Sequence, residues 1–152
     1  MPDSENRLTI LMADDDPDDR MLAQEAFEEA RLANPLHFVT DGVELMDYLR
    51  RRGRYAELAG SPLPSLILLD LNMPKMDGRE ALAEIKADAN LRSVPVVVLT
   101  TSSAEEDIAR AYELGAGSYI VKPVTFEGLV KVMTELKRYW FEIVDLPPEK
   151  EA

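Results

Sequence analysis

The sequence contains no cysteine and one histidine, His37. Without thiols the chain cannot form a disulfide framework, a cysteine nucleophile or a thiolate metal site. One imidazole also argues against a histidine-rich zinc site and against an internal Ser/His/Asp triad. Basic residues are few, because 17 Lys and Arg face 29 Asp and Glu and give a net charge of −12. This charge disfavours general attraction to nucleic-acid phosphates or anionic lipids. With thiols absent and imidazole scarce, oxygen-ligand chemistry remains.

Long apolar runs are also absent. The longest clusters, residues 66–69 and 94–99, are much shorter than the roughly 20 residues that cross a bilayer. Residues 1–7 are polar and acidic and lack the apolar core of a signal peptide, which predicts a cytoplasmic protein. The length of 152 residues and the hydrophobic fraction of 46% are typical of one domain. We expect a disordered N-terminus at 1–6, a folded domain with a C-terminal helix extension at 7–144, and a flexible tail at 145–152.

Short apolar runs alternate along the chain with segments of helical periodicity. This alternation predicts βαβ units and an α/β fold with a mostly parallel sheet. The apolar runs are continuous, which indicates strands buried on both faces under helices. The five predicted strands are residues 8–13, 36–40, 66–70, 96–99 and 119–121.

Helix starts are marked by capping residues. Asp16 followed by Pro17 is typical of an N-cap and a first helical position. A fifth helix is predicted after Pro123, with a one-sided apolar stripe that runs to Lys137. The spacing of a capping box recurs at Asp41/Glu44, Asp77/Glu80 and Ser103/Glu106.

Polar residues follow four of the five predicted strands. In an open parallel sheet, ligands bind beyond the carboxyl ends of the strands, so these side chains should converge at one edge. Grouped carboxylates repel one another unless a cation intervenes, and oxygen ligands suit Mg²⁺ or Mn²⁺. We therefore expect a hard divalent metal at this edge. The residues are Asp14 and Asp15 after the first strand, Asp70 at the third, Thr100 and Thr101 at the fourth, and Lys122 at the fifth.

Carboxylates, a lysine and a hydroxyl around one site are the components of phosphoryl transfer. A carboxylate can itself accept the phosphoryl group and form an acyl phosphate. Taken alone, each residue has a simpler interpretation: Asp16 as a helix cap, Thr100 as a hydrogen-bond partner at a strand end, and Lys122 as a solvated charge. The joint pattern favours phosphoryl transfer.

Four motifs resemble the response regulator receiver family and occur in the family's order. They are Leu-Met-Ala-Asp-Asp at 11–15, Leu-Leu-Asp-Leu-Asn-Met-Pro-Lys-Met-Asp-Gly at 68–78, Leu-Thr-Thr-Ser at 99–102 and Tyr-Ile-Val-Lys-Pro at 119–123. The resemblance covers residues 8–138. It implies a flavodoxin-like, doubly wound sheet of five parallel strands in the order 2-1-3-4-5, with helices on both faces.

The resemblance assigns a role to each residue of the predicted site. Asp70 would accept a phosphoryl group from a phosphohistidine on a partner kinase. Mg²⁺ or Mn²⁺ would be held by the carboxylates of Asp15 and Asp70, with Asn72 contributing its backbone carbonyl. Asp14 would reach the metal through water. Asn72 and Ser102 occupy positions at which the family tunes the lifetime of the acyl phosphate.

The same resemblance implies a conformational switch. Lys122 would contact a phosphoryl oxygen, and Thr100 would donate its hydroxyl to the phosphoryl group. The ring of Tyr119 would then follow the movement of Thr100. Family members commonly have a cis peptide bond before the proline that follows the lysine, so a cis bond is expected between Lys122 and Pro123.

A narrower resemblance indicates a partner. Segments at 41–44, 48–49, 50–64, 77–80, 100–102 and 139–141 are similar to small single-domain response regulators that are paired with bacterial phytochromes or related sensor histidine kinases. Few residues follow the fifth predicted helix, so no DNA-binding output domain is expected. The signal would then pass to a partner protein or through assembly.

Two other functions remain open at this point. A Mg²⁺-dependent phosphatase of the aspartyl-phosphate type would use similar chemistry, but such enzymes carry Asp-x-Asp at the nucleophile, whereas Leu71 and Asn72 follow Asp70. A flavin carrier of similar fold would need a Ser/Thr-rich phosphate loop after the first strand, where this chain has acids. We therefore expect a phosphoacceptor signalling protein and not an enzyme. Turnover of a generic phosphoester would favour the phosphatase.

An apolar cluster lies beyond the fifth predicted helix. An exposed patch of this kind is unusual on a monomer, and aromatic residues are enriched at the cores of interfaces. We expect a homodimer through this segment, and the alternative is a segment that folds back onto its own domain. The residues are Tyr139, Trp140, Phe141, Ile143 and Val144.

Overall fold

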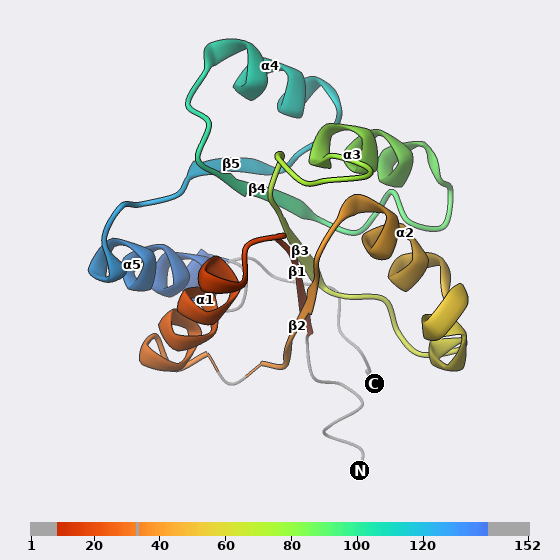
Figure 1. Ribbon diagram of the computed structural model, residues 1–152, viewed down its shortest axis with the longest axis horizontal. Coiled ribbons are helices and arrows are strands. Elements are labelled where there is room, and N and C mark those ends of the chain that lie inside the picture. Colours follow the sequence, from red (N-terminus) through yellow and green to blue (C-terminus); the bar gives the residue numbers. More distant parts are fainter. Residues whose placement is uncertain (1–8, 33, 140–152) are drawn as a thin grey trace.

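One parallel sheet forms the centre of the computed structural model, which describes residues 9–32 and 34–139 (Figure 1). The order across the sheet is β2-β1-β3-β4-β5, and each neighbouring pair is parallel. The strand order implied by the receiver motifs is therefore confirmed. The strands are β1 (Ile10–Ala13), β2 (Leu36–Val39), β3 (Leu66–Leu69), β4 (Val96–Thr100) and β5 (Ser118–Val121).

Helices cover both faces of this sheet (Figure 1). α1 (Pro17–Glu29) and α5 (Phe126–Lys137) lie side by side on one face. The opposite face carries α2 (Gly42–Arg50), α3 (Gly78–Ala87) and α4 (Glu105–Glu113). Parallel strands need crossover connections, and helices in those connections cover both faces of a doubly wound sheet. The expected α/β fold class is therefore confirmed.

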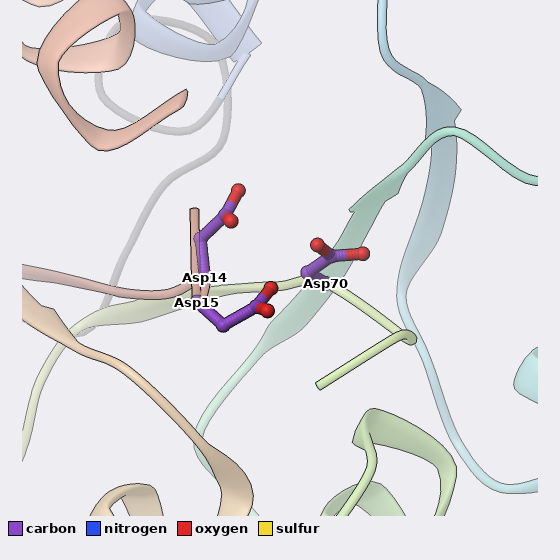
Figure 2. Close-up of side chains that lie close together, drawn as sticks. All are labelled: Asp14, Asp15 and Asp70. Carbon is purple, nitrogen blue, oxygen red and sulfur yellow. The ribbon is translucent and has the colours of Figure 1, made fainter. Parts of the chain in front are cut away.

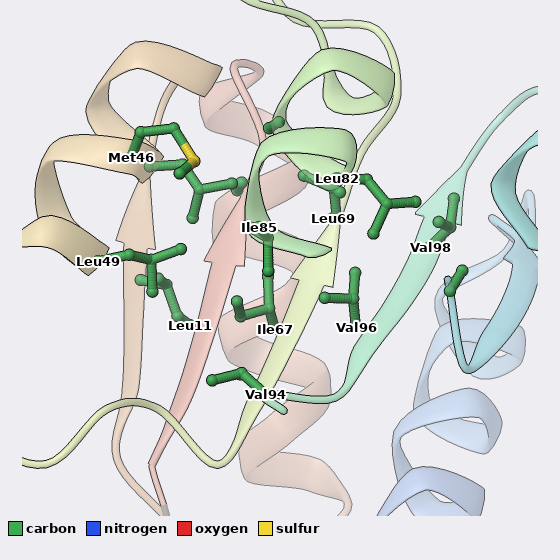
Figure 3. Close-up of a cluster of buried hydrophobic side chains, with 14 of the residues drawn as sticks. Leu11, Met46, Leu49, Ile67, Leu69, Leu82, Ile85, Val94, Val96 and Val98 are labelled. Atoms are coloured by element: carbon green, nitrogen blue, oxygen red, sulfur yellow. The ribbon is translucent and has the colours of Figure 1, made fainter. Parts of the chain in front are cut away.

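The central strands are apolar along their length because each face of the sheet has its own core. On one face, Leu11 and Ile67 share a cluster with Ile85 of α3 (Figure 3). The neighbouring strand residues Met12 and Leu68 belong to the second cluster, beneath α1 and α5. Successive strand residues point to opposite faces, so a strand covered on both sides has no place for a polar residue.

Capping side chains begin most of the helices where the sequence predicted them. Asp16, Asp41 and Asp77 cap α1, α2 and α3, and each accepts a hydrogen bond from a backbone N–H of the first turn. The capping box at Asp77 is reciprocal. At α2 it is not, because the Glu44 carboxylate accepts from the backbone N–H of Thr40, at 2.8 Å.

The capping box predicted at Ser103 is wrong. α4 begins after Ala104, which makes no side-chain capping bond. The hydroxyl that controls this turn belongs to Ser102, which donates to the carboxylate of Asp107 at 2.6 Å. Acidic residues in the first turn of α4 interact favourably with the positive end of the helix dipole.

The connector between α2 and β3 has structure of its own. Residues Gly53–Leu58 form the 3-10 helix η2. Arg51 organises this connector, because its guanidinium donates to the backbone carbonyls of Tyr48, Ser61 and Pro62. These bonds join residues on both sides of η2, a relation that local periodicity does not reveal.

The peptide bond between Lys122 and Pro123 is trans, so the expected cis bond is wrong; the described residues contain no cis peptide. For a bond that precedes proline, the trans form is favoured by about 0.5–1 kcal/mol. The backbone N–H of Lys122 donates to the carbonyl of Thr100 at 2.7 Å, just before α5 begins. The pairing of β4 with β5 is therefore continued through Lys122.

Several predictions concern the ends of the chain. Leu8 of the predicted first strand lies outside the described residues, as do Trp140, Phe141, Ile143 and Val144 of the predicted interface. Tyr139 is the last described residue, and it is 52% exposed. Among the described residues, no helix has the length and apolar character needed to span a membrane.

Gly78 allows α3 to start against the end of β3, next to Asp70. Its backbone N–H donates to the carbonyl of Leu71 at 2.9 Å. A Cβ at this position would lie 2.2 Å from the backbone oxygen of Asp70 and 2.8 Å from Cα of Leu71. Both neighbours are backbone atoms, which cannot turn aside as the end of a flexible side chain can.

We expect Gly78→Ala to lower the free energy of unfolding by about 1 to 3 kcal/mol, the range typical of overpacking. Gly117→Ala is the matched control, because a Cβ there would meet the carbonyl oxygen of Val96 at an ordinary 3.5 Å. Urea unfolding followed by circular dichroism compares the two variants with the wild-type protein. Equal stability of the two variants would contradict this account of α3.

Candidate functional site

The polar side chains predicted at the carboxyl edge of the sheet meet there. Asp14 and Asp15 follow β1, Asp70 follows β3, Thr100 ends β4 and Lys122 follows β5. The Lys122 ammonium bonds to carboxylates from two of these strand ends, and the Thr100 hydroxyl bonds to one of them. The parallel topology thus brings together residues that are far apart in the sequence.

Three of these residues form an acidic cluster. Asp14, Asp15 and Asp70 each offer a carboxylate oxygen, and these oxygens lie within 4.8 Å of one another (Figure 2). Asp14 and Asp70 are buried, whereas Asp15 is exposed and keeps the cluster accessible to solvent. Carboxylates at this spacing repel one another, and oxygen donors are the ligands that Mg²⁺ and Mn²⁺ prefer. The donor set therefore fits a hard divalent cation.

Lys122 places its ammonium group among the acids. Its Nζ donates to Oδ2 of Asp14 at 2.7 Å and to Oδ2 of Asp19 at 2.8 Å. The third contact, to Oδ2 of Asp70, is longer at 3.3 Å. An ammonium group has three N–H donors, and each has a carboxylate partner here. The Lys122 side chain is only 11% exposed, so these contacts are largely shielded from water.

Burial and ion pairing act in opposite directions on the enclosed charges. Burial raises the pKa of Asp14 above its ordinary value, although hydrogen bonds from Lys122 and from the backbone N–H of Asp16 counteract part of this rise. Burial alone would lower the pKa of Lys122, but its hydrogen bonds to Asp14 and Asp19 outweigh that effect and raise the pKa. Lys122 is therefore charged, and its charge compensates the buried carboxylate of Asp14.

Both carboxylate oxygens of Asp70 have defined partners. The hydroxyl of Thr100 donates to Oδ1 at 2.8 Å, within the buried part of the site. The backbone N–H of Asn72 reaches the same oxygen at 3.3 Å, while Lys122 contacts Oδ2. Asp70 is thus oriented from three sides, and a group bonded to its carboxylate would be close to a hydroxyl and an ammonium.

A second network connects the end of β4 with two helices. The hydroxyl of Tyr119 donates to the backbone carbonyl of Ser102 at 2.9 Å. The hydroxyl of Ser102 donates to Asp107 of α4, and Arg79 of α3 also donates to Asp107, at 2.8 Å. The bond from Ser102 and then that from Arg79 lower the pKa of Asp107. The segment after β4 is therefore tied to both α3 and α4.

Sequence reasoning missed two residues of α1 that contact the site. Asp19 pairs with Lys122, and Nη1 of Arg20 donates to the backbone carbonyl of Asp14 at 2.8 Å. Asp18 and Asp19 are both acids of the first helical turn, a pattern that the helix dipole alone accounts for. Only the position of α1 against the sheet reveals that Asp19 reaches Lys122 while Asp18 is exposed.

A family model for the response regulator receiver domain matches residues 10–134 of this chain. The chain belongs to the response regulator receiver family. Members of this family are signalling proteins and generally not classical enzymes, so the match does not favour the phosphatase alternative. The matched segment includes the acidic cluster, Thr100 and Lys122.

Curated relatives match nearly the whole receiver chain. The probable methanogenesis regulatory protein FilR2 of Methanothrix harundinacea (strain 6Ac) is 41% identical over 138 residues, which are 91% of this chain and 86% of the relative. The response regulator Rcp1 of Synechocystis sp. (strain ATCC 27184 / PCC 6803 / Kazusa) is 42% identical over 138 residues, which are 91% of this chain and 92% of Rcp1.

Solved structures agree with the fold of this receiver. The Mn²⁺-bound form of Rcp1 aligns with a TM-score of 0.82 and 41% identity, over 92% of this chain and 99% of that one. The phosphorylated cyanobacterial phytochrome response regulator RcpA aligns with a TM-score of 0.85 and 41% identity, over 93% of this chain and 99% of that one. The similarity to phytochrome response regulators that the narrower motifs indicated is therefore confirmed.

Proposed function

We propose that this receiver accepts a phosphoryl group on Asp70 from a phosphohistidine of a sensor histidine kinase, in a reaction that requires Mg²⁺. The observation that carries the proposal is the environment of Asp70. Its two carboxylate oxygens contact the hydroxyl of Thr100 and the ammonium of Lys122, beside the carboxylates of Asp14 and Asp15. These groups can orient Asp70 and neutralise the charge of an incoming phosphoryl group.

The acidic cluster would hold the metal. Asp15 and Asp70 would bind it through their carboxylates, Asn72 through its backbone carbonyl and Asp14 through water. A divalent cation supplies charge neutralisation for phosphoryl oxygens and relieves the repulsion among the carboxylates. The Mn²⁺-bound state of Rcp1, which is 41% identical, supports a divalent site in this chain.

In the transfer step, a carboxylate oxygen of Asp70 attacks the phosphorus of the phosphohistidine. A P–O bond forms, the P–N bond breaks, and its electron pair returns to the imidazole nitrogen, which takes up a proton. The product is an acyl phosphate on Asp70. Lys122 and Thr100 donate to the phosphoryl oxygens, and later hydrolysis by water regenerates the carboxylate. By the family resemblance, Asn72 and Ser102 would set the lifetime of the acyl phosphate.

Thr100 and Tyr119 would communicate the state of Asp70 to α4. Thr100 is buried, and its hydroxyl already bonds to Asp70, so a phosphoryl group offers it a new acceptor. Tyr119 bonds to the backbone of Ser102, two residues after Thr100, and Ser102 bonds to α4. A shift of Thr100 would therefore change the position that Tyr119 and the start of α4 favour.

The partner kinase would belong to the bacterial phytochromes or related sensor kinases. RcpA is a phosphorylated cyanobacterial phytochrome response regulator, and it shares 41% identity with this chain. The net charge of −12 argues against direct DNA binding, so the signal would pass to a protein partner. This role would be carried out in the cytoplasm.

A homodimer would provide one route for the signal. Tyr139 lines an open, largely apolar groove of about 590 Å³ over β5 and α5, and the predicted interface continues from it with Trp140, Phe141, Ile143 and Val144. A second copy would cover the groove and this apolar segment together, as symmetric dimers pair identical surfaces. The groove is lined in part by Tyr112, Ile120, Val132, Leu136 and Tyr139.

We expect acetyl phosphate to label the wild-type protein on Asp70 when Mg²⁺ is present and not when EDTA is present. Asp70→Asn removes the nucleophilic carboxylate and should abolish labelling. Asp18→Asn is the matched control, since it removes an exposed carboxylate near the site and should label normally. Intact-mass spectrometry measures the added phosphoryl group. Equal labelling of Asp70→Asn and the wild-type protein would exclude Asp70 as the acceptor.

We expect Thr100→Ala to accept the phosphoryl group but to lose the response of α4, because the hydroxyl that contacts Asp70 is removed. Thr101→Ala removes an exposed hydroxyl one residue away and should keep the response. Backbone amide shifts measured with and without acetyl phosphate report on α4. The mechanism fails if Thr100→Ala shows the same phosphate-dependent shifts as the wild-type protein.

We expect the wild-type protein to be a dimer at tens of micromolar in multi-angle light scattering. A chain that ends at Arg138 and the variant Trp140→Ala should be monomeric, because each loses aromatic surface of the predicted interface. A chain that ends at Val144 keeps that surface and should remain a dimer. A monomeric wild-type protein, both with and without phosphorylation, would refute the dimer.

A further inference from the structure

Lys122 is held by one carboxylate that does not belong to the acidic cluster. Asp19, in the first turn of α1, accepts a hydrogen bond from Nζ at 2.8 Å. Its carboxylate is not among the oxygens of Asp14, Asp15 and Asp70 that lie within 4.8 Å of one another. Asp19 is therefore a partner of the lysine and not a member of the predicted metal site.

The three contacts of the Lys122 ammonium group differ in length, and this difference indicates how the group is oriented. The bonds to Asp14 and Asp19 are short, at 2.7 and 2.8 Å, whereas the contact to Asp70 is 3.3 Å. Because an ammonium group has three N–H donors, the two short bonds occupy two of them and leave the third facing Asp70. The contact of this third N–H is the longest of the three. Donating it to a phosphoryl oxygen therefore gives up the weakest of the three hydrogen bonds.

The position of Asp19 is set by the backbone of α1. The Asp16 side chain caps the helix, and Pro17 fixes its first position. Arg20 of the same turn donates to the backbone carbonyl of Asp14. The first turn of α1 is thus anchored to the end of β1. This anchoring holds the side chain of Asp19 next to Lys122.

We infer that Asp19 is a positioning residue for phosphoryl transfer, which acts by holding the ammonium of Lys122 so that one N–H faces the phosphoryl group on Asp70. This inference rests on the proposed function of Asp70. Without Asp19, the lysine keeps one short bond, to Asp14, and its head group can rotate about that bond. The third N–H then no longer has a defined direction toward Asp70. Because phosphoryl transfer depends on positioned charges, a misplaced ammonium group would slow the reaction.

The test must separate this role from the general effect of a negative charge near an anionic phosphodonor. Asp18 provides the matched control, because it is an exposed acid one residue away in the same helical turn. Asp18→Asn and Asp19→Asn remove the same charge from nearly the same place. If the removed charge acted only by repelling the anionic phosphodonor, phosphorylation would be faster in both variants. Loss of the bond to Lys122 affects Asp19→Asn alone.

We expect Asp19→Asn to be labelled by acetyl phosphate about tenfold more slowly than Asp18→Asn at saturating Mg²⁺, the effect of weakening one charge-assisted hydrogen bond. The second readout needs neither metal nor phosphate. In the metal-free protein, the ¹H–¹⁵N signal of the Lys122 ammonium should be observed in the wild-type protein and in Asp18→Asn. It should broaden or disappear in Asp19→Asn, and Lys122→Arg identifies the signal.

Three outcomes would overturn the inference. Asp19→Asn labelled as fast as Asp18→Asn, or faster, would show that Lys122 does not need this partner. An unchanged Lys122 signal in folded Asp19→Asn would show that other groups hold the ammonium. If the wild-type protein takes no label on Asp70, the proposed function fails, and the inference fails with it; the wild-type sample alone identifies that case.

Discussion

Repulsion among the carboxylates at the ends of β1 and β3 is the constraint around which the site is built. Parallel topology places Asp14 and Asp70 at the same edge of the sheet, where both are buried. The ammonium of Lys122, from the end of β5, is within hydrogen-bonding distance of both. Removing one partner from a buried ion pair leaves an uncompensated charge, so the acids and the lysine depend on one another. The carboxylates of Asp14, Asp15 and Asp70 that converge at this edge also fit a divalent cation.

The rest of the fold keeps this edge rigid. Two apolar cores, one on each face, hold the central strands in register, so the residues that follow them cannot move apart without disturbing both cores. Gly78 brings α3 against the backbone of Asp70, and the first turn of α1 is anchored to the end of β1 through Arg20. Rigid elements thus supply the positioning on which the proposed phosphoryl transfer would depend.

The segment after β4 is held in a different way. Its position depends on a few polar contacts, from Thr100 to Asp70 and from Ser102 to Asp107 and Tyr119. Exchanging a few polar contacts costs less free energy than rearranging a packed core. This segment is therefore the part of the site suited to two arrangements. A short path of neighbouring residues therefore joins Asp70 to α4.

The amino-acid sequence by itself determined the α/β class, the five strands, most of the helix caps and the members of the acidic edge. Buried parallel strands leave continuous apolar runs, caps require particular side chains, and polar residues after such strands converge in any parallel sheet. Only the tertiary structure decided that Asp19 and not Asp18 meets Lys122, and that residues Gly53–Leu58 form a helix. Each of these depends on contacts between segments distant in sequence or on the rotation of a helix against the sheet, and local patterns carry no information about either.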